Sequence, residues 1–333
     1  MQPPKLIFER RLDYPHQRSG WAYAQRALEP LLTTAPSAIV LDGMIERNFS
    51  RELTLALEQG RIPYTRPWVG FFHVPAEIPE WFDASKSPLR ILSLPAWRDS
   101  LPHCRGLITL SRRHRDWLRQ RLPDIPVLAL RHPTETPEQK FDFEAYLRHG
   151  QPIVQIGWWL RRLASIHALP LPKERKSLLI PETPDRIPRF LRAVEGERLD
   201  AGAPPLEQWD AAVLSRLPNP DYDELLHRSV VFLHLRDAVA NNAIVECIVR
   251  RTPVLVNPLP SVREYLGEDY PLYFETLDEA AAKAADPDRI LAAHRHLAAF
   301  DPEYLSARTF CRELAESELY QSLPTPVVAE KSA

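Results

Sequence analysis

The sequence predicts an α/β protein made of two doubly wound domains. Short apolar runs alternate with amphipathic helical patterns along most of the 333 residues, and this alternation is typical of parallel sheets covered by helices. The pattern halts in a polar stretch, residues 134–150, and restarts at Gln151. A chain of this length accommodates two domains of ordinary size. We therefore expect one domain over residues 1–150 and a second over residues 151–301.

Composition excludes several functional classes. Hydrophobic residues make up 44% of the chain and charged residues 26%, which is normal for a soluble globular protein. A formal charge of -2 is unlike the basic excess of a general nucleic-acid binder, so no nucleic-acid partner is expected. Glycine is scarce, at 10 residues against 34 prolines, and neither a Walker nor a dinucleotide fingerprint is present. Kinase and dehydrogenase functions therefore lack support.

The sequence also suggests a reducing compartment. Cys104, Cys247 and Cys311 are odd in number and far apart, so we expect free thiols rather than disulfides or zinc ligands. The first residues, MQPPKLIFERR, lack the apolar core of a signal peptide, and no apolar run approaches the length of a membrane span. These features predict a cytoplasmic protein without a membrane span.

In the first domain, five apolar runs predict strands that are connected by helices. The strands are expected at Lys5–Glu9, Ser37–Leu41, Trp68–Val74, Arg105–Leu110 and Val127–Leu130. Helical periodicity is found at Trp21–Leu32, Arg51–Gln59 and Arg112–Leu122. The last of these is strongly basic, but no aromatic stacking platform accompanies it, so a solvated face is favoured over a nucleic-acid surface.

Several polar side chains of this domain lie where strands end or helices begin. His73 ends the third predicted strand, where it is placed to meet a ligand; the alternative is a hydrogen-bonded histidine at a loop start. Ser19 stands at a helix N-cap, and with Gly20 it could present N–H groups to a ligand, or act as a plain cap. Arg18, Trp21 and Asp42 are further candidates for a binding site in this domain.

The second domain repeats the alternation of strands and helices. Strands are expected at Ile153–Ile156, Ser177–Ile180, Val230–Leu235, Thr252–Val256 and Pro271–Phe274. Helices are expected at Gly157–Ile166, Asp185–Val194, Asp221–Arg228, Ala243–Arg251, Leu277–Ala285 and Arg289–Phe300. A further helical pattern covers residues 302–323, and the polar tail at 324–333 is expected to be disordered.

Residues 230–256 form the most informative stretch. A strand, a short helix and a second strand constitute a βαβ unit, whose strands must be parallel. Ligands of such sheets bind at the carboxyl ends of the strands, which is where the loop Asp237–Asn242 lies. Asn241 and Asn242 lead into the helix and could bind sugar hydroxyls or a phosphate at its N-terminus, or serve only as caps. Glu246, one turn inside, could accept ribose or sugar hydroxyls, or form a structural ion pair.

A second candidate cluster opens this domain. Gly157 would let the backbone pass close to a ligand, and Arg161 and Arg162 follow within one turn. Guanidinium groups make planar contacts with phosphate oxygens, so these arginines could hold a diphosphate and neutralise it as a leaving group. The alternative is surface charge. The runs Asp221–Asp223 and Asp286–Asp288 match a metal-binding D-x-D spelling, but both lie at helix starts, where aspartate is a favoured cap.

The pattern NNAIVECIVRRTPVLV resembles the C-terminal half of GT-B glycosyltransferases, and is most similar to their retaining family 4 type. Glu246 matches a glutamate on a helix in that family, Thr252–Val254 its "G-x-P-V" element, and Glu264 a glutamate in a following loop. RGLITLS, VQIGWWLRR and FFHVP are similar to three further segments of the family. The resemblance covers most of the chain.

The resemblance implies two facing Rossmann-like domains with a nucleotide-sugar in the cleft, held mainly by the C-terminal domain. It implies a helix, here residues 302–323, that crosses back to the first domain, and no metal or other cofactor. Arg161, Glu246 and His73 would serve catalysis. Donor contacts would come from the following residues: Ser19, Gly20, Gly157, Arg162, Asp237, Asn241, Asn242 and Glu264. The acceptor stays unknown, and its side of the site would include Arg18, Trp21 and Asp42.

The chain departs from the family at three places. Asn241 and Asn242 stand where the family has the glycines of its "F-G" loop. The first glutamate of the family would fall at Ala238, one residue from Asp237, and the lysine that follows the family's arginine is missing after Arg162. These departures leave open a non-catalytic binding or scaffold protein of the same fold. An epimerase or a phosphorylase is a weaker alternative, because a phosphorylase would need a central lysine that the sequence does not offer.

Overall fold

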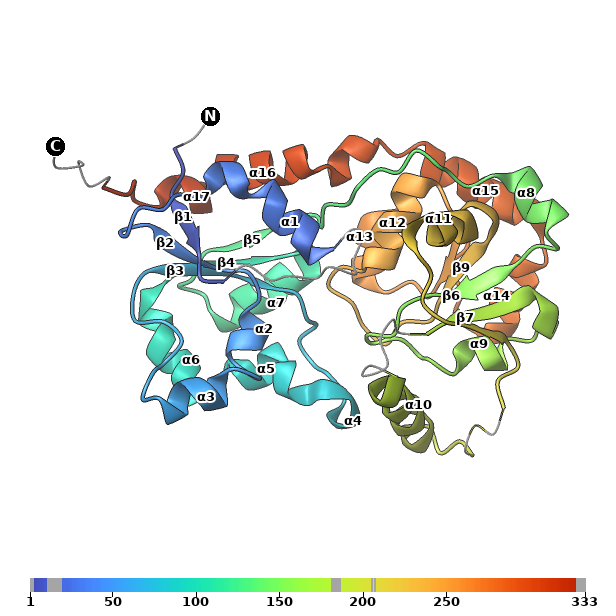
Figure 1. Ribbon diagram of the computed structural model, residues 1–333, viewed down its shortest axis with the longest axis horizontal. Coiled ribbons are helices and arrows are strands. Elements are labelled where there is room, and N and C mark those ends of the chain that lie inside the picture. The colour runs from blue at the N-terminus through green and yellow to red at the C-terminus, as the bar shows by residue number, and fades with distance from the viewer. Residues whose placement is uncertain (1–2, 11–19, 181–186, 205, 207, 328–333) are drawn as a thin grey trace. The chain divides into compact units, whose positions relative to one another are not determined.

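The computed structural model describes residues 3–10, 20–180, 187–204, 206 and 208–327. It divides into two α/β units (Figure 1). Unit 1 comprises residues 1–134 and 303–333, and unit 2 comprises residues 135–302. The expected boundary at residue 150 differs from this division, because residues 135–150 pack with the second unit: the amides of Phe141 and Asp142 donate to the carbonyls of Arg250 and His227.

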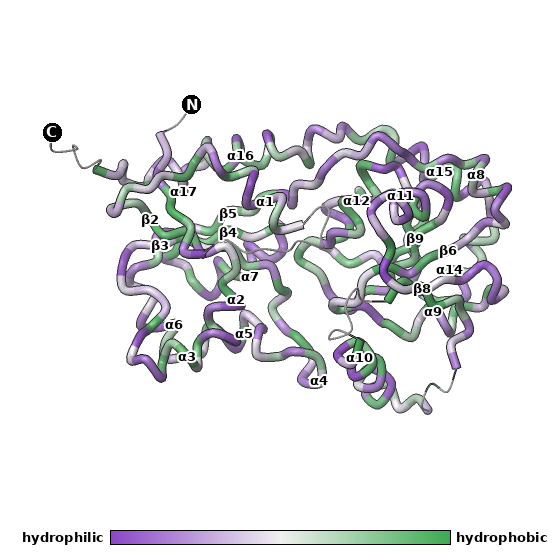
Figure 2. Tube along the Cα trace, in the orientation of Figure 1, coloured by the Kyte–Doolittle hydropathy of each residue, from purple (hydrophilic) through white to green (hydrophobic). Residues whose placement is uncertain are grey.

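The sheet of unit 1 has five parallel strands, and their order follows the chain order. The strands are β1 (Leu6–Phe8), β2 (Ile39–Asp42), β3 (Trp68–Phe72), β4 (Cys104–Thr109) and β5 (Val127–Ala129). All five were predicted from their apolar runs. Figure 2 shows these strands as hydrophobic segments in the interior of the unit.

Short helices connect these strands. Those of the chain's first part are α1 (Trp21–Ala27), η1 (Glu29–Leu31), α2 (Ile45–Asn48), α3 (Leu53–Glu58), α4 (Glu80–Asp83), η2 (Ala84–Lys86), α5 (Pro88–Ile91), α6 (Pro95–Ser100), η3 (Leu101–His103) and α7 (Arg112–Arg121). Ser111 caps α7 by accepting from the amide of His114. An aromatic core packs against the sheet. In this core Tyr64 stacks on Trp68, with ring centroids 4.5 Å apart.

The last segment of the chain packs on unit 1 in three pieces rather than as one helix. These are η5 (Pro302–Leu305), α16 (Ala307–Glu316) and α17 (Glu318–Ser322). Ser306 and Ser317 interrupt the helix, because each side chain caps the piece that follows it. Phe310 of α16 lies 6.1 Å from Phe71 of β3, measured between ring centroids. The expected return of the chain to the first domain is confirmed, while residues 328–333 of the expected tail lie outside the described residues.

The sheet of unit 2 has the strand order β10-β9-β6-β7-β8, and all pairs are parallel. The strands are β6 (Ile153–Gln155), β7 (Lys176–Leu179), β8 (Ala212–Leu214), β9 (Val230–Leu233) and β10 (Val254–Val256). The strand predicted at Pro271–Phe274 is wrong: one bridge joins Tyr273 to Val256, and β8 is the fifth strand instead.

Helices of unit 2 are α8 (Phe143–Arg148), α9 (Ser165–Ala168), η4 (Lys173–Arg175), α10 (Ile187–Asp200), α11 (Asn219–Arg228), α12 (Asn242–Arg250), α13 (Pro260–Leu266), α14 (Leu277–Ala284) and α15 (Pro287–Ala298). The helix predicted at Gly157–Ile166 is wrong except for its last two residues. Gly157 and Leu160 both have positive φ, 70° and 50°, which a right-handed helix does not allow. Residues 157–164 therefore form a loop.

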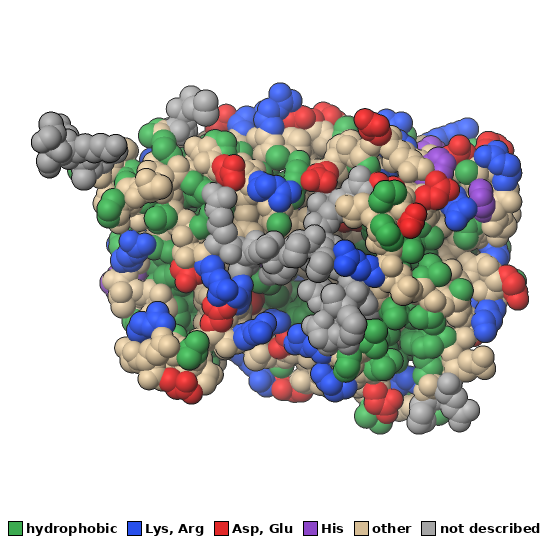
Figure 3. Space-filling view, viewed as in Figure 1, with side chains coloured by type: hydrophobic (Ala, Val, Ile, Leu, Met, Phe, Trp, Pro, Cys, Tyr) green, Lys and Arg blue, Asp and Glu red, His purple; other side chains and the backbone are tan. Residues whose placement is uncertain are grey.

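The distribution of surface charge and the state of the cysteines agree with what the sequence predicted. On the face in view, basic side chains lie among acidic ones (Figure 3). Cys104, Cys247 and Cys311 are all free. No helix in the described part of the chain is long and apolar enough to cross a membrane.

Candidate functional site

The loops that follow β6 and β9 lie at the point where the strand order of unit 2 reverses. The chain moves from β6 to β7 and β8 on one side of β6, and then returns to β9 and β10 on the other side. At such a switch point the two loops diverge at the carboxyl ends of neighbouring strands and leave room for a ligand. Both candidate clusters of unit 2 are on these loops. The topology therefore favours ligand binding at the residues that the sequence analysis selected.

Arg161 is buried in the loop after β6. Its side chain is 8% exposed, and its two terminal nitrogens donate to the carbonyl of Trp159 (2.9 Å) and to Asn241 Oδ1 (3.2 Å). Burial lowers the pKa of this guanidinium to about 10, while Tyr222 and Glu246 oppose that effect. The group therefore stays charged at neutral pH. Its Nε is buried and has no hydrogen-bond partner among the described residues.

Asn241 joins the two loops. Its Oδ1 caps α12 by accepting from the amide of Ala243 at 3.0 Å, and the same atom accepts from Arg161. Capping and contact with Arg161 thus coincide in one side chain. The first turn of α12 holds no acidic residue, so the positive end of the helix dipole and a buried guanidinium lie on the same edge of the sheet. That combination favours an anion.

Glu246 is buried one turn inside α12, and Tyr222 of α11 holds it. The Tyr222 hydroxyl donates to Glu246 Oε2 at 2.8 Å, and burial raises the pKa of Tyr222 well above its usual range. Glu246 also interacts electrostatically with Arg161. Sequence reasoning missed Tyr222, because it treated residues 221–223 only as a metal motif. A tyrosine one helix away from a buried carboxylate gives no periodic signal.

The other residues predicted for the donor occupy varied places. Arg162 is exposed beside the buried Arg161, and Asn242 is the first residue of α12. Asp237 accepts from the amide of Ala238 at 2.7 Å in the loop after β9. Glu264 was expected in a loop but lies inside α13, which begins at Pro260. The donor contact expected for Glu264 stays a prediction.

Supporting residues that the sequence analysis did not select fix the two loops. Asn257 accepts from the amide of Leu235 (2.7 Å) and donates to its carbonyl (2.9 Å), which ties the end of β10 to the loop after β9. Glu197 of α10 accepts from the amide of Leu163 at 2.5 Å. His234 lies 2.8 Å from Ser165 Oγ, and burial lowers its pKa to about 4, so its ring is neutral at pH 7.

In unit 1, His73 follows β3 and its ring lies in an aromatic enclosure. Trp21 meets it edge-on, with ring centroids 4.2 Å apart. The Glu46 carboxylate lies beside it, with Oε2 at 3.6 Å from Nδ1, and neither ring nitrogen has a hydrogen-bond partner in the part of the chain that the structure describes. Trp21 is 6% exposed and packs against the His73 ring, and the acceptor role expected for it stays a prediction.

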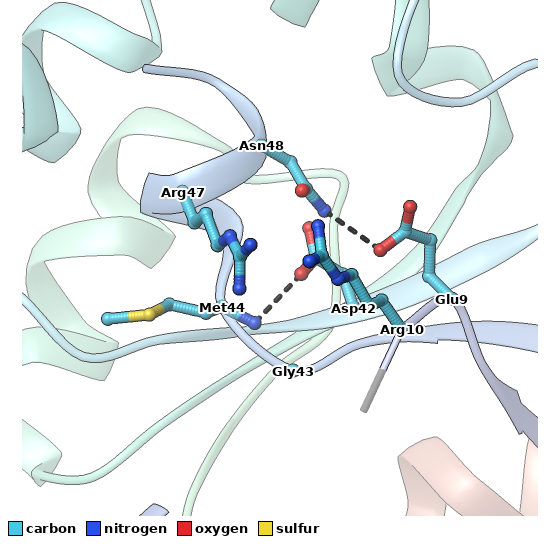
Figure 4. Close-up of a pocket in the computed structure, with 7 residues that line it drawn as sticks. All are labelled: Glu9, Arg10, Asp42, Gly43, Met44, Arg47 and Asn48. Atoms are coloured by element: carbon cyan, nitrogen blue, oxygen red, sulfur yellow. Dashed lines mark hydrogen bonds between the residues drawn. The ribbon is translucent and has the colours of Figure 1, made fainter. Parts of the chain in front are cut away.

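Asp42 ends β2 next to a small pocket, which Figure 4 shows. Its carboxylate accepts from the amide of Met44 (2.8 Å) and from the Tyr64 hydroxyl (2.7 Å). Burial raises its pKa to about 7, and Tyr64 opposes that effect. The pocket has about 190 Å³ of empty space, part of it open to solvent, and is lined by these residues: Glu9, Arg10, Asp42, Gly43, Met44, Arg47 and Asn48.

The start of α1 is only partly described. Gly20 precedes the helix and no side chain caps it, while Arg18 and Ser19 lie outside the described residues. The ligand role expected for Arg18, Ser19 and Gly20 thus stays a prediction.

The two D-x-D stretches have structural roles. Asp223 forms an ion pair with Arg250 at 2.7 Å, and Asp286 caps α15 by accepting from the amides of Asp288 and Arg289. Among the described residues, no group of three or more His, Cys, Asp or Glu side chains could hold a metal ion.

Comparison with known proteins identifies the fold. No family model matches the sequence, and no curated protein matches it. HepE from Anabaena, solved with UDP and glucose, aligns with a TM-score of 0.58 at 12% identity over 84% of this chain and 76% of HepE. A UDP-forming trehalose-phosphate synthase from Burkholderia xenovorans aligns at 0.54 and 15% identity, over 90% of this chain and 77% of the synthase.

TarM aligns with a TM-score of 0.55 at 13% identity, over 91% of this chain but only 58% of TarM. The chain thus spans less than two thirds of TarM. These likenesses establish the fold: two Rossmann-like α/β units of the GT-B type, as the sequence predicted.

Proposed function

We propose that this chain is a glycosyltransferase that takes a sugar from a nucleotide-sugar bound at the carboxyl edge of the unit 2 sheet. The observation that carries the proposal is the buried Arg161, which touches the N-cap of α12 through Asn241 at the switch point of the sheet. A buried cation beside a helix N-terminus suits an anion, and a diphosphate is the anionic part of a nucleotide-sugar.

Each residue of this cluster has a proposed task. Arg161 binds the diphosphate and neutralises its growing charge as the bond to the sugar breaks. Glu246, buried and oriented by Tyr222, accepts the hydroxyls of the ribose. Asn241, Asn242 and the amides at the start of α12 contact phosphate and sugar, and Gly157, Arg162, Asp237 and Glu264 complete the donor contacts that the resemblance implies.

The reaction exchanges two bonds at the anomeric carbon of the sugar. The carbon–oxygen bond to the diphosphate breaks, and a bond to an acceptor hydroxyl forms. We propose retention of configuration without a metal ion, in which case the departing phosphate takes the acceptor proton. His73 contacts the sugar or the acceptor, and Asp42 and Trp21 belong to the acceptor side.

Two of the similar solved structures suggest which donor to try first. The HepE structure contains UDP and glucose, and the Burkholderia synthase is UDP-forming. Both facts concern those proteins, but they make UDP-sugars the first members of a panel that also includes GDP- and dTDP-sugars.

The test is an assay of nucleotide release and of protection against heat, with each donor of the panel and with EDTA present. We expect at least one donor to raise the melting temperature and to be consumed slowly. Arg161→Lys should weaken nucleotide binding about tenfold or more, because a lysine lacks the planar fork of the guanidinium, whereas Arg289→Lys, at an exposed arginine of α15, should not. Stabilisation by none of the nucleotides would overturn the proposal, and binding without release would favour a non-catalytic binding protein.

A further inference from the structure

We propose that Glu46 is a positioning residue for His73, which holds the imidazole with its Nδ1–H toward the carboxylate and leaves Nε2 free to accept a hydrogen bond from a hydroxyl group of the substrate. The assignment of a substrate hydroxyl rests on the proposed glycosyltransferase function. The orientation of the ring and its tautomer do not depend on that function.

The first observation is that Glu46 is fixed by backbone donors of the segment that carries His73. Glu46 is fully buried in α2, and its Oε1 accepts from the amides of His73 (2.5 Å) and Val74 (2.7 Å). Two backbone N–H donors thus converge on one oxygen of this side chain. A buried carboxyl group that is 27 residues away thus holds the turn after β3.

The second observation is the position of the remaining oxygen. Glu46 Oε2 lies 3.6 Å from His73 Nδ1, and neither atom has a hydrogen-bond partner among the described residues. This separation is an ion-pair distance, slightly longer than a hydrogen bond. Catalytic contacts are often long before a ligand binds and tighten afterwards. An acceptor on the Nδ1 side selects the tautomer that is protonated at Nδ1.

The third observation is that the surroundings leave the His73 ring little freedom. The Trp21 ring contacts it edge-on at 4.2 Å, and its side chain is 13% exposed. Two further titratable groups that interact with it are His114 and His132. Burial lowers the pKa of each to about 4, so both are neutral at pH 7 and Glu46 is the charged partner that lies beside the ring.

Together these observations make a dyad with a defined direction. The backbone anchors the carboxylate, the carboxylate orients Nδ1–H, and Nε2 keeps its lone pair. A hydroxylated ligand is the class that such a nitrogen recognises, because a hydroxyl group can donate to it. Glu46 itself would touch no substrate and would act only through His73.

The tautomer can be read directly by ¹⁵N NMR of the whole chain labelled on histidine, since protonated and unprotonated ring nitrogens resonate far apart. His73→Ala assigns the signals. In the unaltered protein near pH 7 we expect Nδ1 to carry the proton. Glu46→Gln keeps an oxygen for the two amides but turns a donating NH₂ toward the ring, so the proton should move to Nε2. Glu80→Gln, at an exposed glutamate of the same unit, should leave the signals of His73 unchanged.

Activity supplies the second readout. With any donor that is consumed, Glu46→Gln should lower kcat about 10- to 100-fold and leave the affinity of the nucleotide for unit 2 unchanged. Protonation of Nε2 in the unaltered protein would overturn the proposal, even if the variant does not fold, and so would an identical tautomer in Glu46→Gln. If the tautomer inverts as expected but no donor is ever consumed, the glycosyltransferase function fails while the positioning role of Glu46 stands.

Discussion

The guanidinium of Arg161 occupies the space that a side chain at residue 157 would need. A Cβ built on Gly157 would lie 2.7 Å from the Cζ atom of Arg161. Gly157 was selected from the sequence as a place where the backbone passes close to a ligand, and the group that lies there is the arginine of the same loop. The glycine thus shapes the proposed anion site indirectly, because it leaves room for the guanidinium.

Substitution of Gly157 by alanine should therefore weaken nucleotide binding. The residue has φ 70°, so alanine costs about 1–2 kcal/mol of folding stability, and its methyl group must also displace Arg161. We expect a loss of affinity of about tenfold, measured by calorimetric titration with the nucleotide that protects the protein best. Gly150→Ala is the matched control, because Gly150 has φ 78° with open space around it. This variant should lose a similar amount of folding stability and keep its affinity for the nucleotide. Equal affinities in the two variants would contradict the role of Gly157.

The hydrogen bond between Tyr222 and Glu246 should stabilise unit 2. Tyr222→Phe removes the donor to a buried carboxylate oxygen, and a buried polar group without its partner costs about 1–3 kcal/mol. Denaturant unfolding of Tyr222→Phe, Glu246→Gln and the double variant measures the coupling between the two side chains. We expect a coupling free energy of about 1 kcal/mol or more. Additive losses would show that the two groups do not interact.

Stability should depend on pH through Asp42. Burial raises the pKa of this carboxyl group from 3.8 to about 7, so the folded protein binds a proton that the unfolded chain releases between these pH values. The stabilisation from Asp42 is therefore complete below about pH 4 and is lost as pH rises to about 7, on the order of 4 kcal/mol in total. Buried His114 and His132 act in the opposite direction, because their lowered pKa values make stability fall as pH falls.

Asp42→Asn separates these effects, since it removes one titration and leaves the histidines in place. The unfolding free energy of both proteins is measured from pH 4 to 8, and the value for the variant is subtracted from that for the unaltered protein. This difference should decline as the pH rises. A difference that is flat over this range would show that Asp42 does not titrate there.

Lys5 should anchor the end of the chain. Its ammonium group donates to the carbonyls of Tyr320 (3.1 Å), Gln321 (3.0 Å) and Leu323 (2.6 Å), which lie at the end of α17. Lys5→Met should cost about 2–3 kcal/mol and speed amide exchange in residues 318–323. Arg90→Met, which removes an exposed ion pair with Glu80, should cost less than about 1 kcal/mol. Unchanged exchange in α17 of Lys5→Met would refute the anchor.

Periodicity predicted most of the fold because it reports burial. The strands of both sheets except β8 were found from apolar runs, and α12 from its spacing. The failures arose where backbone conformation, not hydrophobicity, decides. Residues 157–164 have a helical pattern, but the positive φ of Gly157 and Leu160 forces a loop. The apolar run Pro271–Phe274 is buried without joining the sheet by more than one bridge.

The site was predictable only in part. Parallel strands put the residues at their carboxyl ends on one edge, so Arg161 and Asn241 could be expected together, and they are bonded. Tyr222, Asn257 and Glu46 could not be found in this way, because each reaches its partner through tertiary packing that leaves no local pattern. Glu264 shows the opposite error. The resemblance placed this residue in a loop, but it lies in α13.

The most direct test of the nucleotide site is amide hydrogen exchange of the full chain with and without UDP, GDP or dTDP. If the diphosphate binds to Arg161 at the N-terminus of α12, at least one nucleotide should slow exchange in residues 157–163 and 239–247, and the effect should vanish in Arg161→Lys. Protection by no nucleotide, or protection confined to other segments and unchanged in Arg161→Lys, would contradict the account.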